Sequence, residues 1–68
     1  MVTAYRFQTA LLCVDRQSRT FVSLQPGTVA IRVKDEPEGM VVLRWREREF
    51  LAFAVDLDHR ARAVTTTT

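Results

Sequence analysis

The chain contains one cysteine, Cys13, and one histidine, His59, the usual partners of a thiol nucleophile. A cysteine nucleophile needs a nearby base and a third group that orients this base. Nothing in the spacing places His59 close to Cys13, and Cys13 lies in an apolar run, where a buried and unreactive thiol is the usual case. We therefore expect a protein that is not an enzyme, with no catalytic residue at this pair.

Asp56, Asp58 and His59 bring three possible metal ligands into four consecutive positions. Metal sites of this kind need further ligands, and often a glycine-bearing loop, and neither follows here. We expect a solvated turn in which Asp56 caps nearby backbone amides, with no metal and no cofactor.

Four cations form a group that could contact phosphates: Arg32, Lys34, Arg44 and Arg46. They alternate along two predicted strands and would share one face, so they are candidates for binding a nucleic acid. Only one clear aromatic residue, Phe50, shares this face, and acidic residues flank the group at the predicted loops. A solvated outer face with cross-strand charge pairs is the alternative.

Five apolar residues are predicted on the same outer side of the sheet: Met40, Val42, Phe50, Ala52 and Ala54. A solvated face is normally polar, so this patch needs a cover. Either residues 5–14 lie over it, or a second subunit does, because such patches mark interfaces. We favour a homo-oligomer, most simply a two-fold dimer.

Residues 39–57 are predicted to form one long β-hairpin, because side chains of different character alternate along them. This hairpin carries the five apolar residues and part of the group of cations. Its predicted inner face holds the heavier side chains: Val41, Leu43, Trp45, Leu51, Phe53, Val55 and Leu57. The heavier side chains of the two strands lie on the same face only if the connecting loop has an odd number of residues, because a one-residue slip moves every side chain to the other face. We therefore predict a three-residue loop at 47–49, with Trp45 opposite Leu51.

The rest of the chain predicts further short strands. Pro26 and Gly27 indicate a type II turn, and the alternating residues 28–34 form a strand after it. Residues 5–14 fit a strand or a helix equally well by count, and we favour a strand that forms a hairpin with residues 20–24. Residues 58–60 indicate a turn or one 3₁₀ turn, and residues 60–64 a last short strand. Residues 65–68 are a threonine tail that either extends this strand or frays.

The order of these elements predicts an all-β domain over residues 1–64, a small barrel or rolled antiparallel sheet of five to six strands. Residues 20–64 resemble the SH3-like barrels at Pro26–Gly27, at Leu43 and Trp45, and at Asp56–Leu57. The resemblance implies a fold and leaves the ligand open.

A chain of 68 residues buries only roughly 60% of its unfolded surface and is marginally stable alone. One cysteine cannot form an internal disulfide, so oligomerisation is the remaining way to add stability. No apolar run is long enough for a membrane span, and no signal peptide is recognisable, so we expect a cytoplasmic protein. We predict a self-associating β-barrel that mediates protein interaction, with a nucleic-acid-binding module as the alternative.

Overall fold

The computed structural model describes residues 2–66, and the side chains of residues 3–64. Seven strands and one short helix follow in the order β1 (Val2–Phe7), β2 (Leu11–Asp15), β3 (Phe21–Leu24), β4 (Val29–Glu36), β5 (Met40–Trp45), β6 (Arg48–Phe53), α1 (Ala54–Arg60) and β7 (Ala61–Thr66). The all-β class is confirmed, with seven strands in place of five to six. The threonine tail predicted at 65–68 extends β7 as far as Thr66, which agrees with one of its two predicted forms. Residues 67–68 lie outside the described part.

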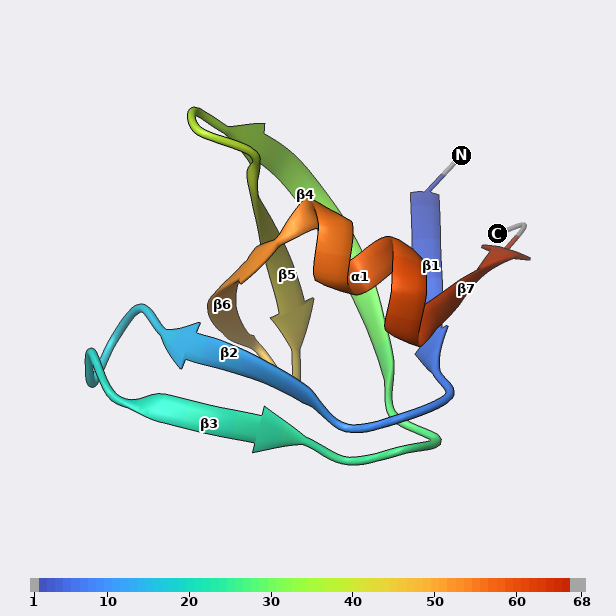
Figure 1. Ribbon diagram of the computed structural model, residues 1–68, viewed down its shortest axis with the longest axis horizontal. Helices are drawn as coiled ribbons and strands as arrows, with labels where there is room; N and C mark the ends of the chain where they lie inside the picture. Colours follow the sequence, from blue (N-terminus) through green and yellow to red (C-terminus); the bar gives the residue numbers. More distant parts are fainter. Residues whose placement is uncertain (1, 67–68) are drawn as a thin grey trace.

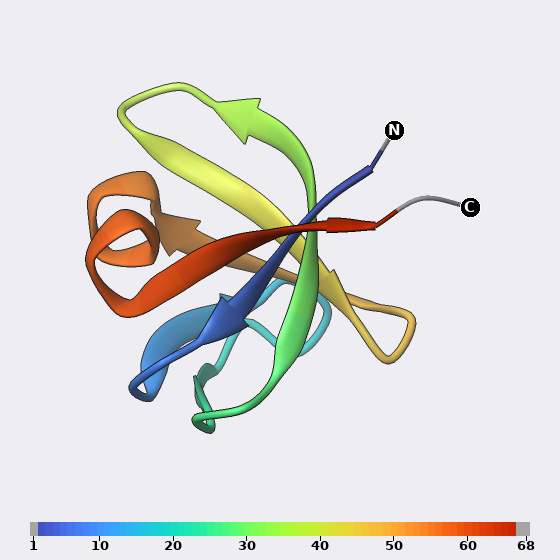
Figure 2. The ribbon, with the colours of Figure 1, turned by 90° about the vertical axis from the view of Figure 1, so that its right-hand side faces the viewer.

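All seven strands belong to one antiparallel sheet with the order β3-β2-β6-β5-β4-β1-β7. This sheet curls into a half-barrel (Figure 1), which confirms a rolled antiparallel sheet. The helix α1 connects β6 to β7 beside the open side of the curl, and β1 and β7 run next to each other toward the two termini (Figure 2). The curl gives the sheet an inner face, which holds the core, and an outer face.

The core is made of side chains from all parts of the sheet and one residue of α1. Its buried members are Phe7, Leu11, Cys13, Leu24, Ala30, Val41, Leu43, Phe50, Ala52, Leu57 and Ala61. Leu57 is completely buried and is the one buried residue of α1. The helix therefore fills the open side of the half-barrel with a single leucine.

The turn at Pro26–Gly27 is confirmed. Gly27 has a φ of 89°, and the backbone N–H of Thr28 donates a 3.2 Å hydrogen bond to the carbonyl of Gln25. A positive φ at the third position is what a type II turn requires, and glycine adopts it without steric cost.

Residues 5–14 form strand structure, and the helix alternative is wrong. The stretch is broken into β1 and β2, because the two strands pair with different neighbours: β1 with β4 and β7, β2 with β3 and β6. At the break, the N–H of Gln8 donates to the carbonyl of Arg60 at 2.7 Å. The predicted hairpin with residues 20–24 is confirmed for β2 and β3.

The register of the long hairpin differs from the prediction. The loop has two residues, Arg46 and Glu47, and Trp45 pairs with Arg48. Both loop residues have positive φ, 52° and 63°, which is the conformation of a type I′ turn. The predicted three-residue loop is wrong, because it was derived by matching the heavier faces of the two strands, and the two-residue turn carries no glycine or asparagine that would have indicated it.

This register reverses the predicted faces of β6. Phe50 lies opposite Leu43 and Ala52 opposite Val41, and both enter the core. Phe53 is 57% exposed, contrary to its predicted place inside. Ala52 belongs to the same buried cluster as Leu57 of the following helix.

The strand also ends earlier than predicted, at Phe53, and α1 follows directly. The backbone N–H of Ala54 donates to the carbonyl of Gly39 at 2.9 Å, which ties the start of the helix to the start of β5. Val55, predicted inside, is 64% exposed on α1. The predicted turn at 58–60 is the end of this helix.

Leu57→Ala is expected to lower the free energy of unfolding by about 2–5 kcal/mol, because it opens a cavity at the only helical contribution to the core. Val55→Ala, on the exposed side of the same helix, should change it by less than about 0.5 kcal/mol. Urea unfolding measures both. Equal effects of the two substitutions would contradict the role given to Leu57.

Glu47→Gly is expected to raise the free energy of unfolding by up to about 1 kcal/mol, because glycine relieves the left-handed strain at a φ of 63°. Glu49→Gly, two residues later inside β6, should lower it, because glycine weakens a strand. A destabilised Glu47→Gly protein in the same urea assay would argue against the type I′ turn.

Candidate interaction surface

The structure does not bring Cys13 and His59 together. Cys13 is buried in the core, its thiol donates to the carbonyl of Leu11 at 3.6 Å, and burial raises the pKa of the thiol to about 11. His59 is exposed in the last turn of α1. A protonated thiol without a base is a poor nucleophile.

Asp56, Asp58 and His59 all lie on α1 rather than in a turn. Asp56 is half-buried, and the other two are exposed. Among the residues that the structure describes, no three Asp, Glu, His or Cys side chains lie close enough together to hold a metal ion. Asp56 instead lines an apolar hollow on the outer side of the sheet.

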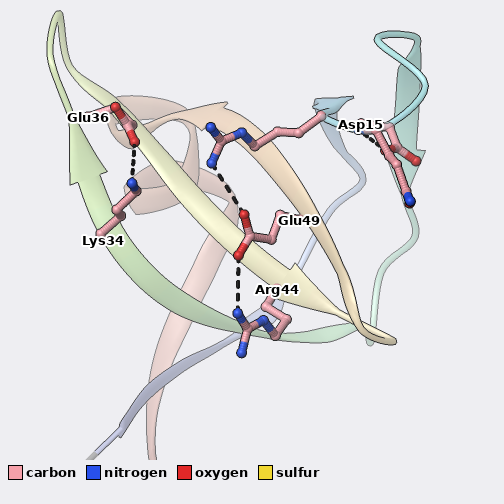
Figure 3. Close-up of polar contacts among 7 residues, drawn as sticks. Asp15, Lys34, Glu36, Arg44 and Glu49 are labelled. Atoms are coloured by element: carbon pink, nitrogen blue, oxygen red, sulfur yellow. Dashed lines mark hydrogen bonds and ion pairs between the residues drawn. The ribbon is translucent and has the colours of Figure 1, made fainter.

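Asp15 is a buried carboxylate that no sequence pattern indicated. Its Oδ1 accepts hydrogen bonds from the backbone N–H groups of Gln17 and Ser18 at 2.9 and 3.3 Å, and its Oδ2 lies 2.6 Å from Arg48 Nη2. Burial alone would raise the pKa of Asp15, but these donors outweigh it and lower the pKa below its ordinary value of 3.8. The contact joins β2 to β6 at the end where the strands pair (Figure 3).

Three of the four predicted phosphate-binding cations are paired with acids. Arg32 lies 2.6 Å from Asp35, Lys34 lies 3.2 Å from Glu36, and Arg44 lies 3.1 Å from Glu49. Glu49 also accepts from Arg16 at 3.3 Å, so it lies between two arginines (Figure 3). Arg46 stacks on the ring of Trp45, with 4.7 Å between guanidinium carbon and ring centroid.

Arg32 does not share a face with Lys34 and Arg44. It pairs with Leu43 of the inner row, and a bulge at Val33 then shifts the register so that Lys34 pairs with Val42. The guanidinium of Arg32 donates to the hydroxyl of Tyr5 at 3.0 Å, and its contacts with Asp35 and Tyr5 raise its pKa. The predicted single stripe of four cations is therefore wrong, because a bulge reverses the alternation.

The outer side of the sheet carries an apolar surface across four strands. Cross-strand pairing aligns Phe21 of β3, Val14 of β2, Leu51 of β6 and Val42 of β5 in one row. Leu12 and the pair Phe53 and Met40 lie beside this row. We call the accessible members the outer apolar face: Leu12, Val14, Phe21, Met40, Leu51 and Phe53.

A hollow of about 320 Å³ opens in the outer apolar face. It is lined by all six of these residues together with Ala52 and Asp56. The hollow lies where β2 and β6 separate, since these strands pair only at Val14 with Leu51 and at Asp15 with Phe50. Asp56 is the single charged residue of its lining.

Only part of the predicted interface set belongs to this surface. Met40 and Val42 lie on the outer side as predicted, although Val42 is covered by its neighbours. Phe50 and Ala52 belong to the core, and Ala54 is half-buried at the start of α1. The contribution of β2 and β3 was missed, and its signal is the run Leu11–Val14, which is apolar on both faces of a strand.

A second hollow, of about 280 Å³, is lined by charged and polar residues: Arg16, Gln17, Glu47, Arg48 and Glu49. Its two arginines are already paired with Glu49 and Asp15. The polar hollow is thus electrically balanced within the chain, and the apolar hollow is the better candidate for a contact with another molecule.

Asp15→Asn is expected to remove part of the acid sensitivity of the fold. Because the folded pKa of Asp15 is lowered, its ionised form stabilises the protein above pH 3.8, and this contribution disappears as the pH falls through the lowered value. Melting temperatures between about pH 2 and pH 5 should fall less steeply in the variant. The matched control Asp58→Asn, exposed on α1, should keep the slope of the unmodified chain, and an unchanged slope in Asp15→Asn would contradict this role.

Comparison with family models, curated proteins and solved structures found no match to this chain. Among the described residues, no helix is long and apolar enough to cross a membrane.

Proposed function

We propose that this protein is a non-enzymatic assembly module that self-associates through the outer apolar face. The observation that supports this proposal is the exposure of two phenylalanines on one continuous sheet surface, Phe21 at 75% and Phe53 at 57%. Contiguous apolar surface of this kind is typical of protein contact sites.

The area of the face suits a dimer. An aromatic side chain carries about 150–250 Å², so the two phenylalanines together expose roughly 250 Å². Leu12, which is 60% exposed, and the half-buried members bring the total to roughly 400–500 Å². A standard interface covers about 800 Å² on each partner, of which about 60% is apolar, so one such face supplies the apolar part.

The charged border of the face favours a second copy as the occupant. On the outer side the face is bordered by Arg16, Arg44 and Glu49 at one end and by Lys34 and Glu36 at the other. In each cluster acidic and basic side chains are in contact, so the same clusters of two copies can approach each other without strong electrostatic repulsion. A nucleic acid is attracted instead by an excess of unpaired positive charge.

Nucleic-acid binding is the alternative function, and it has less support. Lys34 and Arg44 share the outer side but are paired with acids, and Arg32 points to the other side. The membership in the SH3-like barrels likewise stays a prediction, for which the curled antiparallel sheet is the support.

Light scattering at high protein concentration is expected to show a species of twice the chain mass of 7.8 kDa, which dissociates on dilution. Phe53→Glu should convert this species to a folded monomer, because it places a charge within the apolar contact. Val29→Glu, at an exposed valine of β4 away from the face, is the matched control and should remain dimeric.

A monomer at every concentration would contradict the self-association, as would a dimer that Phe53→Glu leaves intact. The absorbance ratio at 260 and 280 nm of the purified protein tests the alternative, because bound nucleic acid raises it. A raised ratio that falls after a high-salt wash would favour the nucleic-acid function.

A further inference from the structure

We propose that Phe21 of each copy inserts into the hollow on the outer apolar face of the other copy. This inference rests on the proposed self-association and names the contact that holds the two copies together. It combines two observations on the same face: a projecting aromatic ring and an apolar hollow of suitable size.

Phe21 is the projecting part. With 75% of its surface accessible, it is the most exposed of the large apolar side chains in the described region. It begins β3, a strand at the edge of the sheet, and its one strand partner is Val14. Phe21 also lines the hollow of its own copy, and most of its surface is still free to contact another molecule.

The hollow is the receiving part. An apolar cavity of about 150 Å³ is enough to hold a benzene molecule, so a hollow of about 320 Å³ has room for a phenylalanine ring. Its walls include Phe21 of the receiving copy and the aliphatic and thioether side chains of Leu12, Leu51 and Met40. Thioether sulfur and methyl groups make favourable contacts with an aromatic ring.

The positions of the two parts are compatible with two-fold symmetry. Val14 of β2 pairs with Phe21 of β3 on one side and with Leu51 of β6 on the other. Neighbouring strands are about 4.8 Å apart, so Phe21 is roughly 10 Å from Leu51 across β2. Phe21 itself borders the hollow. A two-fold axis that lies in the interface and passes between Phe21 and the hollow carries each ring over the hollow of the other copy. Both contacts then form at once, as an isologous interface requires.

The decisive measurement is the nuclear Overhauser effect (NOE) between subunits in a dimer mixed from isotope-labelled and unlabelled full-length chains. We expect inter-subunit NOEs from the Phe21 ring protons to the methyl groups of Met40 and Leu51. Inter-subunit NOEs that involve other residues but not Phe21 would overturn the insertion and leave the self-association standing. A monomer without any inter-subunit NOE would overturn both proposals.

Phe21→Ala tests the same contact by affinity. Sedimentation equilibrium should show a dimer dissociation constant raised roughly ten-fold or more, because a buried aromatic residue at the centre of an interface is a typical hot spot. The control Val29→Ala removes an exposed valine outside the face and should leave the constant unchanged. Circular dichroism should report the same fold for both variants, since both side chains are exposed. A folded Phe21→Ala protein that dimerises as tightly as the unmodified chain would contradict the insertion.

Discussion

The turn of Arg46 and Glu47 determines which side chains of the hairpin enter the interior. Two consecutive residues in the left-handed region cost free energy, because their β-carbons crowd the backbone. Arg46 offsets part of this cost by stacking on Trp45. The resulting register places Phe50 and Ala52 inside, where they belong to the same buried cluster as Leu57 of α1. The core and the helix both depend on this turn.

The same register produces the outer apolar face. Once Phe50 and Ala52 point inward, Leu51 and Phe53 must point outward, next to Val14 of β2. The ion pair of Asp15 and Arg48 holds β2 against β6 at one end, and the strands separate toward the other end. The hollow is a consequence of this separation. An interior completed by one helix thus leaves a second, unfilled apolar surface on the outside of the sheet.

The sequence predicted the turns, the strands and the fold class better than it predicted how neighbouring strands pair with one another. The type II turn at Pro26–Gly27, the hairpin of β2 and β3 and the all-β class follow from local signals and are confirmed. The need for a contact outside the core was predicted from an excess of apolar residues, and an outer apolar face exists. Its membership was predicted wrongly for Phe50 and Ala52, because the register was taken from matching heavy side chains. The stripe of cations failed for a related reason, the bulge at Val33.

The sequence by itself determined the period of each strand, the position of the turns that need proline or glycine, and the surplus of apolar side chains over what one small core can hold. Only the tertiary structure decided which side of each strand is inside. Alternation specifies two faces without saying which is buried, and one residue more or less in a loop exchanges them. That choice depends on how Phe50, Ala52 and Leu57 fill a shared volume, and such packing joins residues from separate elements.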